Sequence, residues 1–426
     1  MATSLIKIPP SKPSSTSSLP VLVPLTIFDK AAIDLHVVVL CAFRPPMPSN
    51  EVMKEALSKV LLYFPHLAGR FTIDSQGRAC IALNNAGIRV TETYLPTNIS
   101  EHLPFEPPKE VSHLLPSSIE GIEELLQIQL NRYACGGLVI GLTAHHRVYD
   151  GQSMSGFFVA WARLVRGLDI DPLPYLDRHK ILVPRNPPII EFDHHSVEFR
   201  KTTNTLPDTP IPSSPIEGLS INFSNEFINK LKAKVLNDNQ TDVFRGYSNF
   251  ECLLAHVWKK VTLARELKLD EWTQVRVAVN GRTRMKPPVP MEFAGNLVLW
   301  AYPKLRVTEL LHGSYDHVAK AIHDAVAKID HKYFQSFIDF GEKASQLEEE
   351  LEATSQLEIA NTMCPNLEVD SWMRFQFHEL DFGGGPLCFL PSKHTRGRAV
   401  DIHTFLSRGW RCRCGHVPLA STCSAL

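Results

Sequence analysis

The sequence lacks an excess of either charge, a long apolar run and any closely spaced cysteine pair. Its 44 Lys and Arg nearly balance 45 Asp and Glu, so the formal net charge is −1. A chain so balanced has no overall field to attract nucleic acid or a membrane surface. It also contains no run of about 18 apolar residues, the length that a transmembrane helix requires. We therefore expect neither nucleic acid nor a membrane among its partners.

Cysteine usage and the N-terminal segment indicate the compartment. The nine cysteines are odd in number and irregularly spaced, with no CxxC pair. This pattern is typical of reduced thiols rather than of a disulfide framework. The first 20 residues are rich in Ser and Pro, contain no Arg and lack the apolar core of a signal peptide. These features favour a cytoplasmic protein, and we expect a monomer.

The length of the chain predicts two domains. Its 426 residues exceed one ordinary core and suit two domains of about 200 residues each. A Pro-rich stretch with little periodicity, at 173–216, is the predicted crossover linker. We therefore predict an N-terminal domain over 1–172 and a C-terminal domain over 217–426. Strands alternate with helices in both halves, which is typical of an α/β protein with two similar layered domains.

Four segments of the first half have clear local patterns. The β-branched run 34–43 has the length of a buried strand, and 125–146 predicts two paired strands around Gly136-Gly137. Asn50 is the predicted N-cap of a helix over 51–64. Residues 153–167 predict an amphipathic helix that ends at Gly167.

The second half begins again with helices and strands. Ser224 is the predicted N-cap of one helix, and Ser248 forms a capping box with Glu251 before another helix over 249–267. Residues 274–284 predict a strand and a turn, and about 309–340 a long helical region. The acidic sequence QLEEELEA (346–353) predicts a solvent-exposed helix.

A His-xxx-Asp pattern at His146 and Asp150 carries the predicted chemistry. The pattern alone is weak, because His312 and Asp316 also match it within a predicted surface helix. The context separates the two matches: the apolar strand LVIGLTA delivers His146, Gly151 allows a sharp turn, and an aromatic helix follows. An imidazole titrates near pH 6.5, so His146 suits the role of a general base at neutral pH.

Two other interpretations of this pattern stay open. One makes His146 a core histidine beside a helix-capping Asp150, which is common for a bare match. The other is a metal site formed by His145, His146 and Asp150. It is weaker, because adjacent strand residues point to opposite faces and the two imidazoles diverge. We expect no metal and no bound cofactor.

Four segments follow one another along the chain: HHRVYDG (145–151), NGRTRMKPPVP (280–290), GNLVLWA (295–301) and DFGGG (381–385). Their sequences and their order resemble those of the plant BAHD acyltransferases. The resemblance runs from about Val23 to Ser392. VPLTIFDK and FFVAWARLVRGLDIDP look more like one branch, the agmatine and putrescine hydroxycinnamoyltransferases of grasses. The family resemblance implies two chloramphenicol-acetyltransferase-like domains joined by a crossover loop, with a channel between them. Coenzyme A thioester is then a substrate rather than a cofactor.

The same resemblance implies further catalytic roles. The indole N–H of Trp372, in VDSW, is the expected donor to the oxyanion of the tetrahedral intermediate. A Trp packed in the core is an equal alternative from the sequence alone. Asp150 is expected to be a structural partner of Arg284 or Arg282 rather than a proton relay. No covalent acyl-enzyme is needed.

The late glycine-rich motif departs from the usual family pattern. Most of the family has DFGWG, whereas this chain has Gly384 in place of Trp, as the amine-acylating branch does. We expect Asp381, Gly383 and Gly385 to form a backbone turn that needs glycine rather than to act chemically.

Acidic residues suggest which acceptor is used. A buried ammonium must be paired, and Glu368 and Asp370 alternate along a predicted strand that leads to Trp372. Asp34 lies in an otherwise apolar strand. These three are the candidate acceptor-binding residues, and they favour transfer from hydroxycinnamoyl-CoA to an amine such as agmatine or putrescine. An O-acyltransferase for shikimate or quinate is the alternative, and Glu368 as a plain surface residue is another.

The last segment, 393–426, does not resemble the family. Arg and Cys alternate there with little strand or helix periodicity, as in RCRC (411–414). Translation in a shifted frame explains this better than a divergent tail. We therefore expect the second domain to lack an internal strand, which leaves an inactive binding protein as a further alternative.

Overall fold

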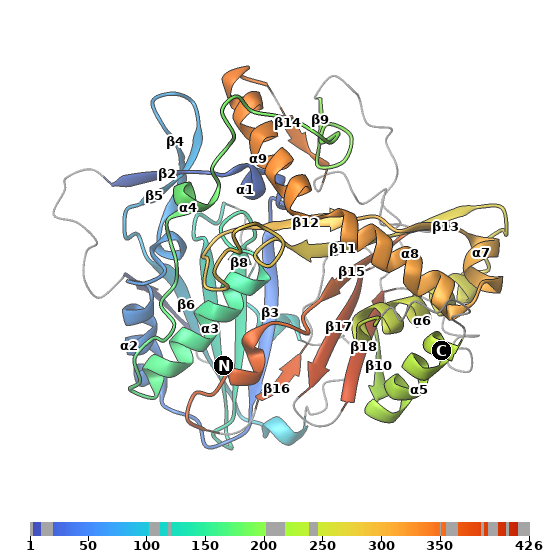
Figure 1. The fold of residues 1–426 in the computed structure, drawn as a ribbon. Helices are drawn as coiled ribbons and strands as arrows, with labels where there is room; N and C mark the ends of the chain where they lie inside the picture. Colours follow the sequence, from blue (N-terminus) through green and yellow to red (C-terminus); the bar gives the residue numbers. More distant parts are fainter. Residues whose placement is uncertain are drawn as a thin grey trace. The chain divides into compact units, whose positions relative to one another are not determined.

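The computed structural model describes residues 3–9, 20–101, 111–117, 121–201, 218–237, 246–349, 351–354, 365–384, 387–390, 399–405 and 409–415. The chain divides into two units (Figure 1). Unit 1 comprises Met1–Pro184, Val289–Leu297 and Phe375–His394, and unit 2 the remainder. The predicted division into contiguous domains is therefore replaced by a discontinuous one, because two segments of the second half fold with the first.

Unit 1 is built on a six-stranded sheet in the order β1-β6-β7-β8-β3-β16. Only β6 and β7 run parallel, and the other neighbours are antiparallel. The edge strand β16 comes from the segment after DFGGG and explains why this segment joins unit 1. The strands are β1 (Thr3–Ile8), β3 (His36–Phe43), β6 (Ile88–Leu95), β7 (Leu126–Tyr133), β8 (Leu138–His145) and β16 (Leu387–Leu390).

The central hairpin of this sheet confirms the strand pair predicted at 125–146. Gly136 turns the chain with φ of +84°, a conformation that favours glycine. Every residue of β8 is buried, as expected for a strand covered on both faces. The strand predicted at 34–43 is confirmed as β3, but it begins at His36, so Asp34 precedes the strand rather than lying in it as predicted.

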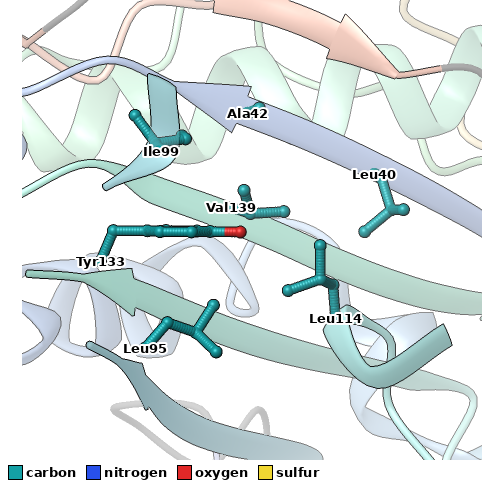
Figure 2. Close-up of a cluster of buried hydrophobic side chains, with 7 residues drawn as sticks. All are labelled: Leu40, Ala42, Leu95, Ile99, Leu114, Tyr133 and Val139. Atoms are coloured by element: carbon teal, nitrogen blue, oxygen red, sulfur yellow. The ribbon is translucent and has the colours of Figure 1, made fainter. Parts of the chain in front are cut away.

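Each face of the sheet is covered by a different layer. On one face, buried apolar side chains form a cluster (Figure 2): Leu40, Ala42, Leu95, Ile99, Leu114, Tyr133 and Val139. On the other, helices α2 (Asn50–Val60) and α3 (Gly151–Val165) pack together. Alternation along β3 produces this division, since Leu40 and Ala42 belong to the cluster whereas Phe43 contacts Phe382 edge to face.

The helix caps of unit 1 follow the predictions with one correction. Ser49, rather than Asn50, caps α2, because its Oγ accepts the amide hydrogen of Val52. Gly167, with φ of +71°, ends α3 as predicted. The aromatic side of α3 packs in the core, where Trp161 lies edge to face on Phe382.

Smaller elements complete unit 1. They are the sheet β2-β5-β4, made of Val21–Pro24, Ala79–Leu83 and Arg70–Ile73, the short helices α1 (Ile27–Ala31) and α4 (Arg178–Ile181), and the 3-10 turns η1 (Pro65–Ala68), η2 (Ile99–Glu101), η3 (Ser112–Leu114) and η5 (Gln376–Glu379). Helix α4 lies within the predicted linker, so the first part of that linker is ordered structure of unit 1.

Unit 2 is built on a seven-stranded sheet in the order β10-β18-β17-β15-β11-β12, with β13 also pairing β11. Helices α5, α6 and α8 lie beside it in Figure 1. The strands are β10 (Gly218–Ser224), β11 (Trp272–Asn280), β12 (Val298–Ala301), β13 (Lys304–Arg306), β15 (Leu367–Ser371), β17 (Ala399–Phe405) and β18 (Gly409–Gly415).

The C-terminal segment corrects one prediction. Strands β17 and β18 form a hairpin inside this sheet, between β15 and β10. The expectation that the second domain lacks an internal strand is therefore wrong. Strand pairing uses backbone groups, and Val400 and Ile402 alternate with polar residues at the period of a strand. The frame-shift hypothesis itself stays a prediction.

The helices of unit 2 confirm both predicted N-caps. Ser224 accepts from the Phe227 amide, and Ser248 and Glu251 form the capping box. The helical region around 309–340 is three helices rather than one, because Ser314 and Asp330 each cap a new start. The helices are α5 (Asn225–Asn237), α6 (Asn249–Ala264), α7 (Val307–His312), α8 (Tyr315–Lys328) and α9 (His331–Gln346).

The prediction of an acidic helix at QLEEELEA (346–353) is wrong. Helix α9 ends at Gln346, and β14 (Leu351–Ala353) then pairs with β9 (Phe199–Lys201). Glu352 lies opposite Arg200 and forms an ion pair with it at 2.7 Å, so a cross-strand contact outweighs local helix propensity. Among the described residues, no helix combines the length and apolar character that spanning a membrane demands.

Candidate active site

His146 directly follows the buried strand β8. Its amide donates to the Leu35 carbonyl at 3.0 Å, and its own carbonyl accepts from Asn296 Nδ2 at 2.9 Å. The backbone of His146 is thus held from two sides, while the residue as a whole is only half-buried. A fixed backbone and incomplete burial are compatible with the role of a general base.

Asp150 closes the same loop and is almost fully buried. One carboxylate oxygen accepts from the Ser153 amide at 2.9 Å, which makes Asp150 the N-cap of α3. The other accepts from the Leu297 amide at 3.1 Å. These contacts support the predicted structural role of Asp150. Its predicted pairing with Arg282 or Arg284 stays a prediction.

The residues inside the motif anchor it to the core. Val148 and Tyr149 are buried, and the Tyr149 hydroxyl lies 3.0 Å from His66 Nδ1. Burial raises the pKa of Tyr149, so the phenol stays neutral. Burial, with a smaller contribution from the nearby Arg178 guanidinium, lowers the pKa of His66 well below 6.5.

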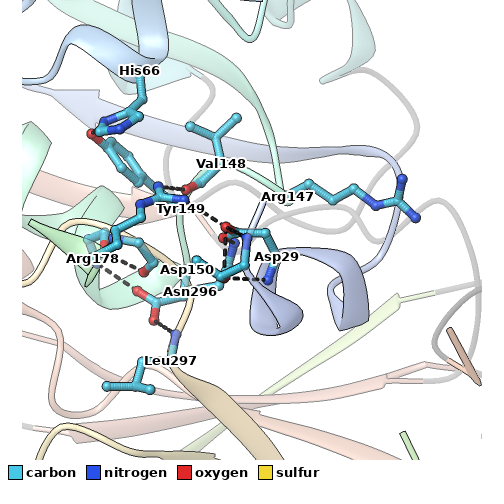
Figure 3. Close-up of polar contacts among 12 residues, drawn as sticks. Asp29, His66, Arg147, Val148, Tyr149, Asp150, Arg178, Asn296 and Leu297 are labelled. Carbon is cyan, nitrogen blue, oxygen red and sulfur yellow. Dashed lines mark hydrogen bonds and ion pairs between the residues drawn. The ribbon is translucent and has the colours of Figure 1, made fainter. Parts of the chain in front are cut away.

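An ion pair beneath the loop was not anticipated from the sequence. Asp29 is fully buried, and Oδ2 accepts from Arg178 Nη1 at 2.7 Å while Oδ1 accepts from Asn296 Nδ2 at 2.9 Å. Arg178 also donates through Nη2 to the Val148 carbonyl at 3.0 Å (Figure 3). We call Asp29, Arg178 and Asn296 the Asp29 network.

The members of the Asp29 network lie in three segments that are far apart in the sequence. Asp29 belongs to VPLTIFDK and Asn296 to GNLVLWA, two segments that carry the family resemblance, and Arg178 lies in the predicted linker. The capping box of Thr26 with Asp29 at α1 is a local signal that marks Asp29 as ordered. No local signal connects residues this far apart in the chain.

Asp34 and His145 form a separate cluster with Arg147. Asp34 pairs with Arg147 Nη1 at 2.8 Å and with His145 Nε2 at 3.3 Å. The hydrogen bond from His145, aided by Arg147, lowers the pKa of Asp34 against the effect of burial. His145 Nδ1 accepts from the Arg147 amide at 3.3 Å. Both ring nitrogens of His145 are therefore engaged within this cluster.

The other predicted acceptor-binding residues lie in unit 2. Glu368 and Asp370 are on β15, two positions apart and therefore on one face. Glu368 forms an ion pair with Arg276 Nη1 at 2.7 Å, and the Arg276 guanidinium stacks 4.0 Å from the Trp300 ring centre. Trp372 follows β15 and is half-buried, and its role as oxyanion donor stays a prediction.

The two candidate arginines follow β11. Arg282 is fully buried, and its amide donates to Asn280 Oδ1 at 3.0 Å. The Arg284 amide donates to the Gly281 carbonyl at 2.9 Å within the predicted turn.

The DFGGG segment forms a turn at the edge of unit 1. Asp381 accepts from the Gly383 amide at 2.7 Å and pairs with Arg166 at 2.9 Å. Gly383 has φ of +82°, so this position needs glycine as predicted. A Cβ at Gly384 would lie 2.2 Å from the Pro46 carbonyl oxygen, so this backbone excludes a larger residue there. Gly385 lies outside the described residues.

Comparisons with known proteins extend these observations. A family model described as the Transferase family matches residues 2–408. The chain is 47% identical over 373 residues to tryptamine hydroxycinnamoyltransferase 2 of Oryza sativa subsp. japonica, covering 86% of this chain and 83% of that protein. It is 39% identical over 393 residues to agmatine coumaroyltransferase-1 of Hordeum vulgare, with coverages of 91% and 88%.

A solved structure confirms the fold. Vinorine synthase superposes with a TM-score of 0.72 at 21% identity, covering 99% of this chain and 97% of that one. Fold and family together define an acyl-CoA-dependent acyltransferase. The chain belongs to the Transferase family, the BAHD acyltransferases, as its motifs predict.

Proposed function

We propose that this protein transfers a hydroxycinnamoyl group from its coenzyme A thioester to a primary amine, with His146 as general base. The observation that carries the proposal is the His146 loop itself. Its backbone is fixed by Leu35 and Asn296, yet the residue as a whole is only half-buried. The amine-acylating enzymes at 47% and 39% identity support the choice of acceptor class.

The proposed reaction needs one base and one oxyanion donor. An aliphatic amine with a pKa near that of Lys, about 10.4, arrives largely protonated, so only its free-base form attacks. As nitrogen bonds to the thioester carbonyl carbon, His146 takes the proton from nitrogen. The tetrahedral oxyanion, with Trp372 N–H as the proposed donor, collapses and expels the coenzyme A thiolate. The imidazolium returns its proton to that thiolate, and an amide remains.

Ion pairing of the acidic candidates bears on which amine is used. Asp34 pairs with Arg147, and Glu368 pairs with Arg276. A carboxylate that is already paired offers less to the second ammonium or guanidinium of a diamine. This favours a monoamine with an aromatic group, as in the tryptamine enzyme at 47% identity. Agmatine or putrescine is the second candidate, supported by the barley agmatine enzyme at 39% identity.

An acceptor panel tests the proposal. The purified protein is incubated with p-coumaroyl-CoA and, separately, tryptamine, agmatine, putrescine and shikimate, and the products are identified by mass spectrometry. We expect amides, with the highest kcat/KM for tryptamine. Formation of the shikimate ester alone would refute the amine assignment. No product with any acceptor would favour the inactive binding protein.

Neutralising Glu368 separates the two amine candidates. If Glu368 holds the remote cation of a diamine, Glu368→Gln removes a charge-assisted bond of about 1.5–3 kcal/mol and raises the agmatine KM about tenfold to a hundredfold. Asp370→Asn and Asp34→Asn are tested in parallel. Because Glu368 is paired with Arg276, we expect the ratio of agmatine to tryptamine kcat/KM to change less than threefold in the Glu368→Gln protein.

A further inference from the structure

We infer that Arg178 and Asn296 are positioning residues for His146, through the Asp29 network beneath the loop His146–Asp150. This inference rests on the proposed role of His146 as base. Arg178 belongs to the predicted linker and Asn296 to the segment Val289–Leu297, and neither side chain need touch a substrate to act in this way.

Side chains of the Asp29 network bind two carbonyl groups of the loop. Asn296 Nδ2 donates to the His146 carbonyl at 2.9 Å, and Arg178 Nη2 donates to the Val148 carbonyl at 3.0 Å. Two residues of the motif are therefore bound by side chains from distant parts of the sequence. Since a side chain's direction follows from its backbone, fixing these carbonyls restricts where the His146 imidazole points.

Asp29 orients both of these donors. Its carboxylate accepts from Arg178 and Asn296 as well as from the amide and hydroxyl of Thr26, each at 2.7–2.9 Å. Asp29 is fully buried, and Arg178 and Asn296 are 3% and 4% exposed. Hydrogen bonds shielded from water are stronger than exposed ones, so the three side chains act as one rigid unit.

The backbone explains how two distant segments reach the same carboxylate. Tyr175 and Phe293 form a parallel β-bridge, with Tyr175 N–H donating to the Glu292 carbonyl at 2.9 Å and Ala294 N–H to the Tyr175 carbonyl at 2.9 Å. Arg178 and Asn296 each lie three residues after their member of that bridge. The bridge thus places Arg178 and Asn296 at equivalent positions on neighbouring segments, from which both side chains reach Asp29.

The guanidinium is required for its geometry and not only for its charge. Its planar fork places Nη1 on Asp29 and Nη2 on the Val148 carbonyl at the same time. A lysine ammonium retains the charge but concentrates it at one point, so it cannot reproduce both contacts in the same directions. Arg178→Lys therefore keeps the buried ion pair and loosens the loop.

A matched control exists in unit 2. Arg185 also pairs with a fully buried aspartate, donating through Nε to Asp339 at 2.5 Å and through its amide at 2.8 Å. It differs in being one-third exposed, and its described partners are remote from His146 in the sequence. Arg185→Lys thus reports the stability cost of the same chemical change without contact to the His146 loop.

The experiment compares Arg178→Lys, Asn296→Ala, Arg185→Lys and His146→Ala as purified proteins, at a temperature well below every melting temperature. We expect kcat to fall about tenfold or more in Arg178→Lys and Asn296→Ala, with both KM values changed less than threefold. We expect Arg185→Lys to lower the melting temperature without lowering kcat. Asn296→Ala leaves the Arg178–Asp29 pair in place and keeps the test available if Arg178→Lys fails to fold.

The outcomes distinguish the positioning role of Arg178 and Asn296 from the role of His146 as base. Folded Arg178→Lys and Asn296→Ala proteins with unchanged kcat, beside an inactive His146→Ala, overturn the positioning role and leave the base intact. An equal fall of kcat in Arg185→Lys overturns it too, because a general stability effect then suffices. Unchanged turnover in His146→Ala overturns the proposed base, and the positioning role with it.

Discussion

Two buried polar networks, one in each unit, use similar residues with different consequences. In unit 2, His194 Nδ1 lies 2.9 Å from Glu198 and its Nε2 lies 3.0 Å from Ser336 Oγ. We call these three residues the His194 network. It has the serine, histidine and carboxylate of a hydrolase triad. In unit 1, the Asp29 network contains no histidine but holds the backbone of one.

Access to solvent decides which network serves chemistry. The side chains of the His194 network are fully buried, and Ser336 Oγ already accepts from the amides of Glu191 and Phe192 at 2.9 and 3.2 Å. A hydroxyl so occupied has no room for a carbonyl substrate. His146 is half-buried, and its amide and carbonyl are held by the Leu35 carbonyl and the Asn296 side chain. Residue types in contact therefore do not define a site unless one of them can be reached.

Replacing His146 tests this comparison with the largest expected effect. We expect His146→Ala to lower kcat at least about a hundredfold, the usual scale for losing a general base, with little change in melting temperature. His194→Ala should do the reverse, lowering stability and leaving kcat at low temperature nearly unchanged. His312→Ala, at the exposed end of α7, is the neutral control. Equal losses of turnover in all three proteins would contradict the assignment.

Asp150→Asn sharpens the distinction between a chemical and a structural carboxylate. Asn caps helices as well as Asp, so the contact with Ser153 survives. The contact with Leu297 does not, because one oxygen becomes an NH2 group that faces another donor. We expect a loss of about 1–3 kcal/mol in unfolding free energy, measured by urea titration, with a parallel fall in rate. A variant of normal stability without activity would show that Asp150 acts in the chemistry itself.

Ser336→Ala tests the purely structural network. The change leaves His194 Nε2 and the amides of Glu191 and Phe192 without their shared partner. Each buried unpaired group costs about 1–3 kcal/mol, so a clear fall in urea midpoint is expected. Because we assign the His194 network a structural role only, the kcat of Ser336→Ala should stay within about twofold of the value for the unmodified protein. A large fall in kcat at unchanged stability would mean that this network, too, serves catalysis.

The sequence alone predicted the parts of this molecule that depend on local patterns. Strands β3, β7 and β8, the end of α3 and the turn at Gly383 follow from β-branched runs and glycine positions. The proposed base also follows, because a buried strand delivers it. The Asp29 network does not follow, since its residues meet only after the chain has folded. Strand β14 was not predicted for the same reason, because its partner strand β9 is distant in sequence.

The pH dependence of stability gives the smallest and most specific test, at His66 beside the Asp29 network. Burial and the Arg178 guanidinium lower the pKa of His66 well below 6.5, and the Tyr149 phenol that it contacts stays neutral. As the pH falls below about 6.5, His66 therefore binds a proton in the unfolded chain but stays neutral in the folded chain. The stability contributed by neutral His66 is complete above pH 6.5 and declines as the pH falls below it.

His66→Gln isolates this contribution. Glutamine keeps a hydrogen-bonding group near Tyr149 but does not titrate. Between pH 6.5 and 5.0, the unfolding free energy of the unmodified protein should fall more steeply than that of His66→Gln, by up to about 1.4 kcal/mol per pH unit. His36 and His256, whose pKa values are also lowered, contribute equally to both proteins and cancel in the difference. Identical slopes of unfolding free energy against pH in the two proteins would contradict this prediction, because they would mean that His66 accepts a proton in the folded state despite the nearby Arg178 guanidinium.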